Sequence, residues 1–147
     1  QQKIGVIGAL ANDKNSPLGS WRIGSDDNTA VSVLEGLKKY SSNLTYAKGA
    51  DLAIGKTDFI NEVKINETDT SGFKEAIQLA SNSDMVIMVL GEHGFQSGEG
   101  RSRTKLNLPG VQQQLLEAVY AVNKNIVLVL MNGRPLLPGP MKTYHPL

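Results

Sequence analysis

The sequence predicts an α/β fold: a three-layer sandwich with a mostly parallel sheet and helices on both faces. Three short segments rich in Val and Ile are apolar at every position, which is typical of strands buried on both faces. Helical patterns alternate with these segments along the chain. Such alternation favours parallel strands joined by right-handed crossovers.

The predicted strands come first. Each is short, apolar and followed at or near its end by Gly or Asn, and they lie at residues 3–10 (KIGVIGAL), 84–90 (DMVIMVL) and 125–131 (NIVLVLM). A weaker strand pattern occupies residues 43–47 (NLTYA).

Three helices are predicted between the strands. Apolar residues recur at helical spacing in residues 29–40, 72–80 and 109–122. Thr29 is the expected N-cap of the first helix, because its hydroxyl can accept a backbone N–H. Pro109 suits the first turn of the third, where no N–H is needed.

Composition limits the classes of function. The 147 residues fit one domain, and 40% hydrophobic with 20% charged residues is ordinary for a globular protein. A net charge of +1 with no cluster of Lys and Arg predicts neither a nucleic acid nor an anionic membrane as partner. The longest apolar run, residues 126–131, is too short to span a bilayer. The absence of cysteine excludes thiol catalysis and Cys-based zinc sites.

Two long polar loops follow predicted strands, at residues 11–28 and 91–108. Open α/β sheets bind ligands at the carboxyl ends of their strands, so these loops are candidate sites. A third irregular stretch, residues 50–71, carries no convergent chemistry in the sequence.

The loop GEHGFQSGEGRSRT has the richest chemistry: two carboxylates, one imidazole and two guanidiniums. Glu99 lies between two glycines and could move toward a substrate as a general acid. A merely solvated loop is the competing interpretation. His93 has no second metal ligand nearby, so no metal and no cofactor is predicted.

This loop, with LNLPGVQQQLLEAV and NIVLVLMNGRPL after it, resembles the second domain of family 3 β-glucosidases, and most of all the bacterial periplasmic branch. The segments KIGVIGALA, Gly19-Ser20-Trp21 and VSVLEGLKK agree. The resemblance assigns residues 1–136 to that C-terminal α/β domain and leaves residues 137–147 as a tail outside the family pattern.

The resemblance implies a retaining glycosidase, in which one carboxyl group attacks the anomeric carbon and another protonates the leaving oxygen. The acid/base of that branch precedes a Ser-Arg-Thr triplet, which here is Ser102-Arg103-Thr104, and so corresponds to Glu99. The family's nucleophile is an aspartate on a preceding (β/α)8 barrel, which needs about 250 residues and is not in this chain. The chain alone is therefore expected to be inactive.

The implied partners are the enzyme's own N-terminal barrel and a β-linked glucoside or short oligosaccharide. The full-length protein is expected to be periplasmic or secreted, with its signal outside this chain.

Five further residues have two interpretations each. Glu92 and His93 either bind substrate or organise the loop, and for Glu92 acceptance of backbone N–H groups is favoured. Arg101 and Arg103 contact substrate hydroxyls or pin the loop by ion pairs. Trp21, the only tryptophan, stacks on a sugar ring or fills a domain interface or core.

The family pattern stops after Leu136, where LPGPMKTYHPL replaces further helix and strand patterns. Its three prolines cannot continue a helix or a central strand. A truncated domain is thus expected, with an unpaired strand edge that is prone to association.

Two other classes of function stay open. One is a non-catalytic sugar-binding module, which rejoining the barrel and assaying hydrolysis would distinguish. The other is a nucleotide- or phosphate-binding module, which titration with nucleotides against a glucose-like inhibitor would distinguish. The second is weakened because Gly5-Val6-Ile7-Gly8 is not G-x-G-x-x-G and no strand is followed by G-K-[ST].

Overall fold

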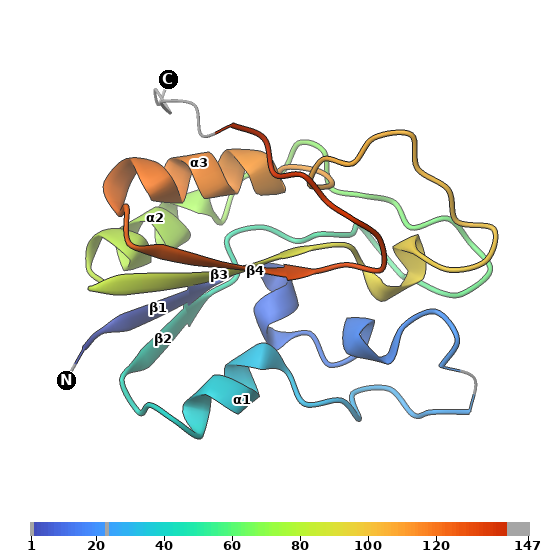
Figure 1. Cartoon of the computed structure of the whole chain (residues 1–147), viewed down its shortest axis with the longest axis horizontal. Helices are drawn as coiled ribbons and strands as arrows, with labels where there is room; N and C mark the ends of the chain where they lie inside the picture. Colours follow the sequence, from blue (N-terminus) through green and yellow to red (C-terminus); the bar gives the residue numbers. More distant parts are fainter. Residues whose placement is uncertain (1, 23, 141–147) are drawn as a thin grey trace.

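The computed structural model describes residues 2–22 and 24–140, and its strands form one parallel sheet (Figure 1). The strand order is β2-β1-β3-β4. The strands are β1 (Ile4–Ile7), β2 (Leu44–Ala47), β3 (Met85–Gly91) and β4 (Ile126–Met131). All four predicted strands are confirmed. The first is shorter than expected, because Ala9–Asn12 forms a 3-10 turn, η1.

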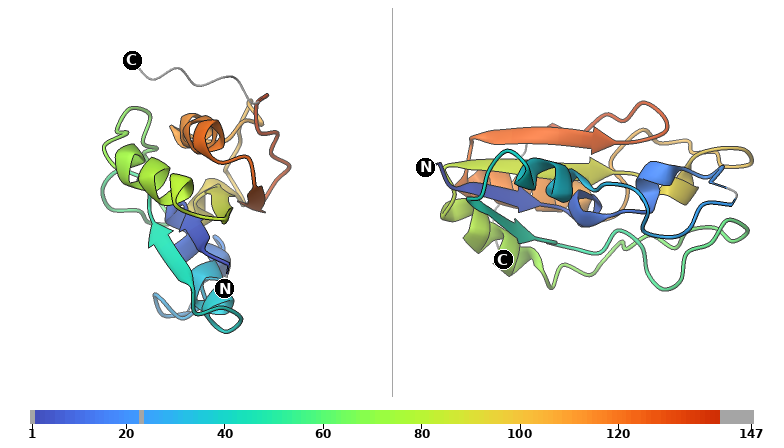
Figure 2. Two further views of the ribbon diagram at one scale, coloured as in Figure 1. Left: turned by 90° about the vertical axis from the view of Figure 1, so that its left-hand side faces the viewer. Right: turned by 90° about the horizontal axis from the view of Figure 1, so that it is seen from below.

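Helices cover both faces of the sheet, so the predicted three layers are confirmed (Figure 2, left). Successive strand residues point to opposite faces. Val86, Met88 and Leu90 pack with the helices α2 (Phe73–Ser81) and α3 (Gln112–Val122). Ile87 and Val89 belong to a second core, which includes residues of α1 (Val33–Lys38) and η1.

The prediction for the start of α1 was wrong. Its N-cap is Ser32, whose side chain accepts the Glu35 N–H while the Glu35 carboxylate accepts the Ser32 N–H. This reciprocal capping satisfies two backbone donors at once and outcompetes a single cap. Thr29 instead donates its hydroxyl to the Asp26 carbonyl oxygen, outside the helix.

The first turn of α3 also differs from the prediction. Pro109 lies in a turn before the helix, and Val111 is the N-cap. The Pro109 carbonyl accepts a hydrogen bond from the Gln112 side chain at 2.9 Å. The residues before the helix therefore bond to a side chain of its first turn.

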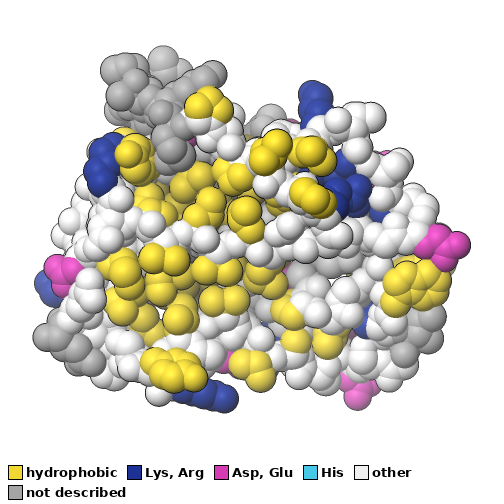
Figure 3. Space-filling model, in the orientation of Figure 1, with side chains coloured by type: hydrophobic (Ala, Val, Ile, Leu, Met, Phe, Trp, Pro, Cys, Tyr) yellow, Lys and Arg dark blue, Asp and Glu magenta, His cyan; other side chains and the backbone are white. Residues whose placement is uncertain are grey.

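Strand β4 forms one edge of the sheet. Among the described residues it pairs only with β3, and none of its six residues is charged. Val127 is 47% exposed, and apolar side chains gather on the surface over β4 and α3 (Figure 3). The unpaired edge expected from the sequence is this strand.

All long loops leave from the same end of the sheet, because the four strands are parallel (Figures 1 and 2, right). These are residues 8–32, 48–72, 92–111 and 132–140. In the part of the chain that the structure describes, no helix has the length and apolarity to cross a membrane.

Candidate active site

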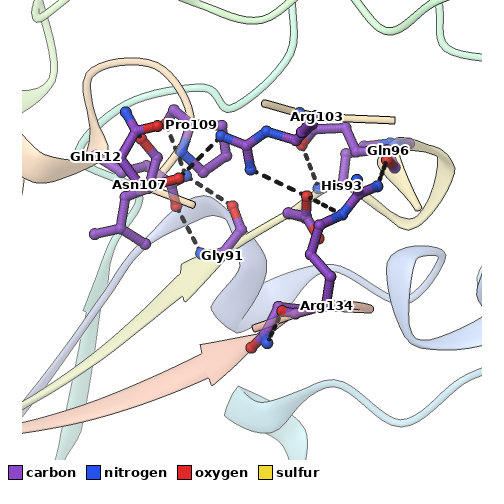
Figure 4. Close-up of polar contacts among 11 residues, drawn as sticks. Gly91, His93, Gln96, Arg103, Asn107, Pro109, Gln112 and Arg134 are labelled. Atoms are coloured by element: carbon purple, nitrogen blue, oxygen red, sulfur yellow. Dashed lines mark hydrogen bonds and ion pairs between the residues drawn. The ribbon is translucent and has the colours of Figure 1, made fainter. Parts of the chain in front are cut away.

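The loop between β3 and α3, residues 92–111, carries both Glu92 and Glu99 and is called the Glu99 loop. Its starting point is fixed by Gln112, which is buried (Figure 4). Its side-chain oxygen accepts the Gly91 N–H at 2.9 Å, and its amide nitrogen donates to the Gly91 carbonyl at 2.8 Å. The end of β3 and the start of α3 are thereby tied together. The loop that begins at Glu92 therefore leaves from a rigid point.

Glu92 is the charged centre of this base. Its side chain is 1% exposed, and its Oε1 lies 3.0 Å from Arg103 Nη1 and 3.1 Å from Arg134 Nε. The first contact is a hydrogen bond, and the second is an ion pair without hydrogen-bond geometry. The other oxygen, Oε2, is buried without a hydrogen-bond partner among the described residues. A charge buried this deeply is tolerated only when it is paired.

The Glu92–Arg103 pair joins the two ends of the loop. Arg103 also donates a hydrogen bond to the Asn107 carbonyl oxygen at 2.9 Å, which fixes the part of the loop that leads to α3 (Figure 4). Arg103 thus makes an ion pair within the loop, as the second of its two interpretations expects, and contact with substrate hydroxyls stays a prediction. Glu92 organises the loop through two guanidiniums, whereas the sequence favoured backbone N–H groups as its donors.

Glu99 lies in the outer half of the same loop and is exposed. Among the described residues it makes no ion pair and no hydrogen bond through its side chain. The two glutamates of the loop therefore have opposite surroundings: one is buried and paired, the other is free to contact a ligand.

Trp21 comes from the loop after β1 and adjoins the Glu99 loop. Gly98 has φ +110°, and a Cβ there would lie 2.2 Å from Ser20 Oγ and 3.9 Å from Trp21 Nε1. Only glycine allows this close approach. Trp21 is 58% exposed, so it does not fill the core of this chain.

The stretch 50–71 takes part in this site, although its sequence carried no recognisable chemistry. The Phe59 ring lies 6.0 Å from that of Trp21 and 6.5 Å from that of Phe95. Arg101 donates a hydrogen bond to the Phe59 carbonyl oxygen. Three loops thus meet around Phe59. The available signal was an apolar pair, Phe59-Ile60, inside a polar stretch.

His93 lines a pocket of about 290 Å³, formed mainly by the loops that follow β1 and β3, with Asp13 and Arg22 among the other lining residues. Its Nδ1 accepts the Phe95 N–H at 3.1 Å. Burial lowers the pKa of His93; the Asp13 charge opposes this effect and the Arg22 charge adds to it. The neutral ring is therefore the favoured form in the folded protein.

This lowered pKa predicts a loss of stability in acid. Because the folded pKa lies below the ordinary value of 6.5, the contribution of His93 is complete above that pH and is lost as the pH falls through the folded pKa. His93→Asn, whose side-chain oxygen can replace Nδ1 as acceptor, should lose less stability between pH 7.5 and pH 5. Urea unfolding at both values measures this. An identical pH dependence in the two proteins would contradict it.

A second pocket, of about 620 Å³, is lined by Arg101, Arg103 and Thr104 from the loop after β3 and by Glu62 and Glu67 from the loop after β2. Both pockets therefore adjoin the loop that carries Glu99. No group of three His, Asp or Glu side chains that could hold a metal ion occurs in residues 2–22 and 24–140.

The sequence analysis missed Arg134 as a site residue. Arg134 follows β4, and β4 lies beside β3, so its side chain reaches Glu92. It is 18% exposed and also donates to the Gln96 carbonyl oxygen. The only signal in the sequence is a cation three residues after the predicted strand 125–131; that this strand lies beside the one that bears Glu92 follows from the strand order of the structure.

The fold and the site define a parallel α/β domain in which polar loops gather at one edge of the sheet, around a buried, paired Glu92 and an exposed Glu99. Comparisons with known proteins give the family. The chain matches the family described as "Glycosyl hydrolase family 3 C-terminal domain" over residues 1–145. It is 38% identical to a periplasmic β-glucosidase of Salmonella typhimurium over 90% of its length, and 37% identical to a β-xylosidase of Formosa agariphila over 98%.

Solved structures agree. A family 3 β-glucosidase of Bifidobacterium adolescentis is 33% identical with a TM-score of 0.68, covering 92% of this chain and 18% of that chain. A β-glucosidase of Listeria innocua in complex with isofagomine is 26% identical with a TM-score of 0.73, covering 92% and 17%. The chain belongs to glycoside hydrolase family 3, as its C-terminal α/β domain. The chain spans 19% of the length of the Salmonella β-glucosidase and 20% of that of the Formosa β-xylosidase.

Proposed function

We propose that this domain supplies Glu99 as the general acid/base of a retaining β-glucosidase-type hydrolase. The nucleophile would be an aspartate on an N-terminal (β/α)8 barrel, and the active site would lie between the two domains. In such a reaction the acid protonates the leaving oxygen, then acts as base on the water that hydrolyses the glycosyl-enzyme.

The observation that carries this proposal is the contrast between the two glutamates. Oε1 of Glu92 is occupied by two guanidiniums, and its side chain is buried where no sugar can reach it. Glu99 is exposed on a loop whose two ends are held together. A general acid must lie within hydrogen-bond reach of the leaving oxygen, and of the two glutamates in this loop only Glu99 is accessible to one.

The surroundings of Glu99 in this chain are incomplete for catalysis. A carboxyl group that acts as acid near neutral pH needs a partly desolvated environment. Glu99 is exposed, so the docked barrel would supply that environment. For the same reason we propose that the chain alone does not turn over glycosides.

The substrate proposed is a β-linked glucoside or short oligosaccharide. Trp21 and Phe59 expose aromatic surface beside the Glu99 loop, which suits the apolar face of a sugar or another leaving group. Relatives include enzymes named β-glucosidase, β-xylosidase and exo-α-(1→6)-L-arabinopyranosidase. The sugar that is bound would therefore be selected largely by barrel residues.

A periplasmic or secreted location is proposed for the full-length protein, as the name of the Salmonella relative suggests.

The test compares the purified chain with the same domain joined to its barrel, using an aryl β-glucoside. The chain alone should release no aryl group above the enzyme-free rate, whereas the joined protein should hydrolyse the substrate. Turnover by the pure chain would contradict the proposal, because a second catalytic group would then lie within these residues. Binding of a glucose-like inhibitor without hydrolysis by the joined protein would favour a sugar-binding module instead.

A further inference from the structure

The turn that follows β4 contacts the Glu99 loop. Gly133 lies against Ser97: a Cβ at Gly133 would be 2.1 Å from Ser97 Oγ. The next residue, Arg134, donates to the Gln96 carbonyl oxygen. These contacts reach the loop two and three residues before Glu99.

Arg134 connects this support to the buried charge. Its Nε lies 3.1 Å from Glu92 Oε1, while its Nη2 bonds Gln96. Gln96 in turn accepts the His93 N–H through its side-chain oxygen at 2.8 Å, which closes the 3-10 turn η3 (Gly94–Gln96). Figure 4 shows Arg134, Gln96 and His93 in this arrangement. One guanidinium thus holds both the first residue of the loop and the turn that leads to Glu99.

We propose that Arg134 is a positioning residue for Glu99: it acts through Gln96, from the turn that follows the strand next to the one that bears the loop. The inference rests on the proposed acid/base role of Glu99. Arg134 touches neither substrate nor the reacting atoms in this role; it sets where the carboxyl group stands when the barrel is docked.

The geometry requires a guanidinium and not merely a positive charge. Two different nitrogens of Arg134 serve two partners, and lysine has only one nitrogen. In Arg134→Lys a single ammonium has to serve partners that two separate nitrogens of the guanidinium now contact, so it should hold Gln96 and Glu92 less firmly. A misplacement of about 1 Å in a catalytic group can lower a rate on the order of 10²-fold.

The first measurement uses the chain itself and does not depend on catalysis. In hydrogen exchange, the backbone amides of residues 93–96, which are all hydrogen-bonded in the unchanged chain, should exchange faster in Arg134→Lys and Arg134→Met. Lys48→Met is the control: its ammonium follows β2 at the same edge of the sheet but pairs with Asp51 at 2.7 Å. Unchanged exchange in both Arg134 variants would overturn the proposal.

The second measurement uses the domain joined to its barrel. Arg134→Lys should lower kcat/KM for a substrate with a poor leaving group by about ten- to 100-fold, and for a dinitrophenyl glycoside by much less, because kcat/KM reports glycosyl-enzyme formation and only the poor leaving group needs a placed proton donor in that step. Lys48→Met should change kcat/KM for both substrates by the same factor.

The outcomes separate this proposal from the acid/base assignment. If Glu99→Ala shows leaving-group dependence and Arg134→Lys slows both substrates equally, the positioning role is wrong and the acid/base role stands. If Glu99→Ala itself shows no such dependence, the proposed function fails.

A second variant tests the same contact without changing any charge. The added methyl group of Gly133→Ala would clash with Ser97, so this variant should slow the substrate with the poor leaving group more than the dinitrophenyl glycoside. An equal effect on both substrates would count against positioning.

Discussion

Glu99→Ala in the protein with its barrel should slow hydrolysis of an alkyl or sugar β-glucoside by about 10²- to 10⁴-fold, the usual contribution of general acid/base catalysis. A poor leaving group cannot depart without a proton, so glycosyl-enzyme formation limits its rate. Dinitrophenolate departs without protonation, so for a dinitrophenyl β-glucoside the first step should survive. The comparison of kcat/KM for the two substrates measures the difference.

Azide provides the complementary measurement. In Glu99→Ala the glycosyl-enzyme lacks the base that activates water, and azide attacks without needing deprotonation. Added azide should therefore raise kcat for the dinitrophenyl substrate and give a glycosyl azide. Glu75→Ala, at an exposed position in the first turn of α2, is the control and should behave as the unchanged enzyme. Leaving-group dependence and azide rescue at Glu92 instead of Glu99 would move the assignment to Glu92.

The layered fold could be predicted because its signals are local. Continuous apolar segments such as residues 85–90 indicate strands buried on both faces, and the structure pairs them in parallel. The start of α1 was misplaced although its signal was present. Ser32-x-x-Glu35 is a capping-box pattern, and two reciprocal bonds outweigh the single cap expected from Thr29.

The candidate site was predictable only where its residues share one loop. Glu92, Arg103 and Glu99 lie within twelve positions, so their grouping could be inferred from the sequence. Arg134 and Phe59 join them only because of the strand order and the path of the chain after β2. Local periodicity contains no information about which strands become neighbours, so these contacts required the structure.

The two glutamates should also differ in their effect on stability. Glu92→Gln removes the charge that faces two largely buried guanidiniums, each 18% exposed, and leaves them repelling one another. Breaking a buried ion pair from one side costs about 3 to 5 kcal/mol; since Gln keeps an acceptor oxygen, we expect about 3 kcal/mol here. In a domain of this size that corresponds to a fall in Tm of about 6 to 12 °C. Glu99→Gln, exposed and unpaired, should change the free energy of unfolding by less than about 0.5 kcal/mol.

A double-mutant cycle shows whether the loss at Glu92 comes from these partners. If the ion pair is the cause, Glu92→Gln should cost markedly less in an Arg103→Met background, because one of the two unpaired charges is then already gone. Urea unfolding of the four proteins gives the coupling energy, which should lie between about 1 and 3 kcal/mol. In the protein with its barrel, Glu92→Gln should lower the rates for poor and good leaving groups by similar factors, since it disturbs the loop as a whole. Additive effects in the cycle would mean that Glu92 is held by something other than Arg103, and would remove the ion pair as the fixed base of the loop that carries Glu99.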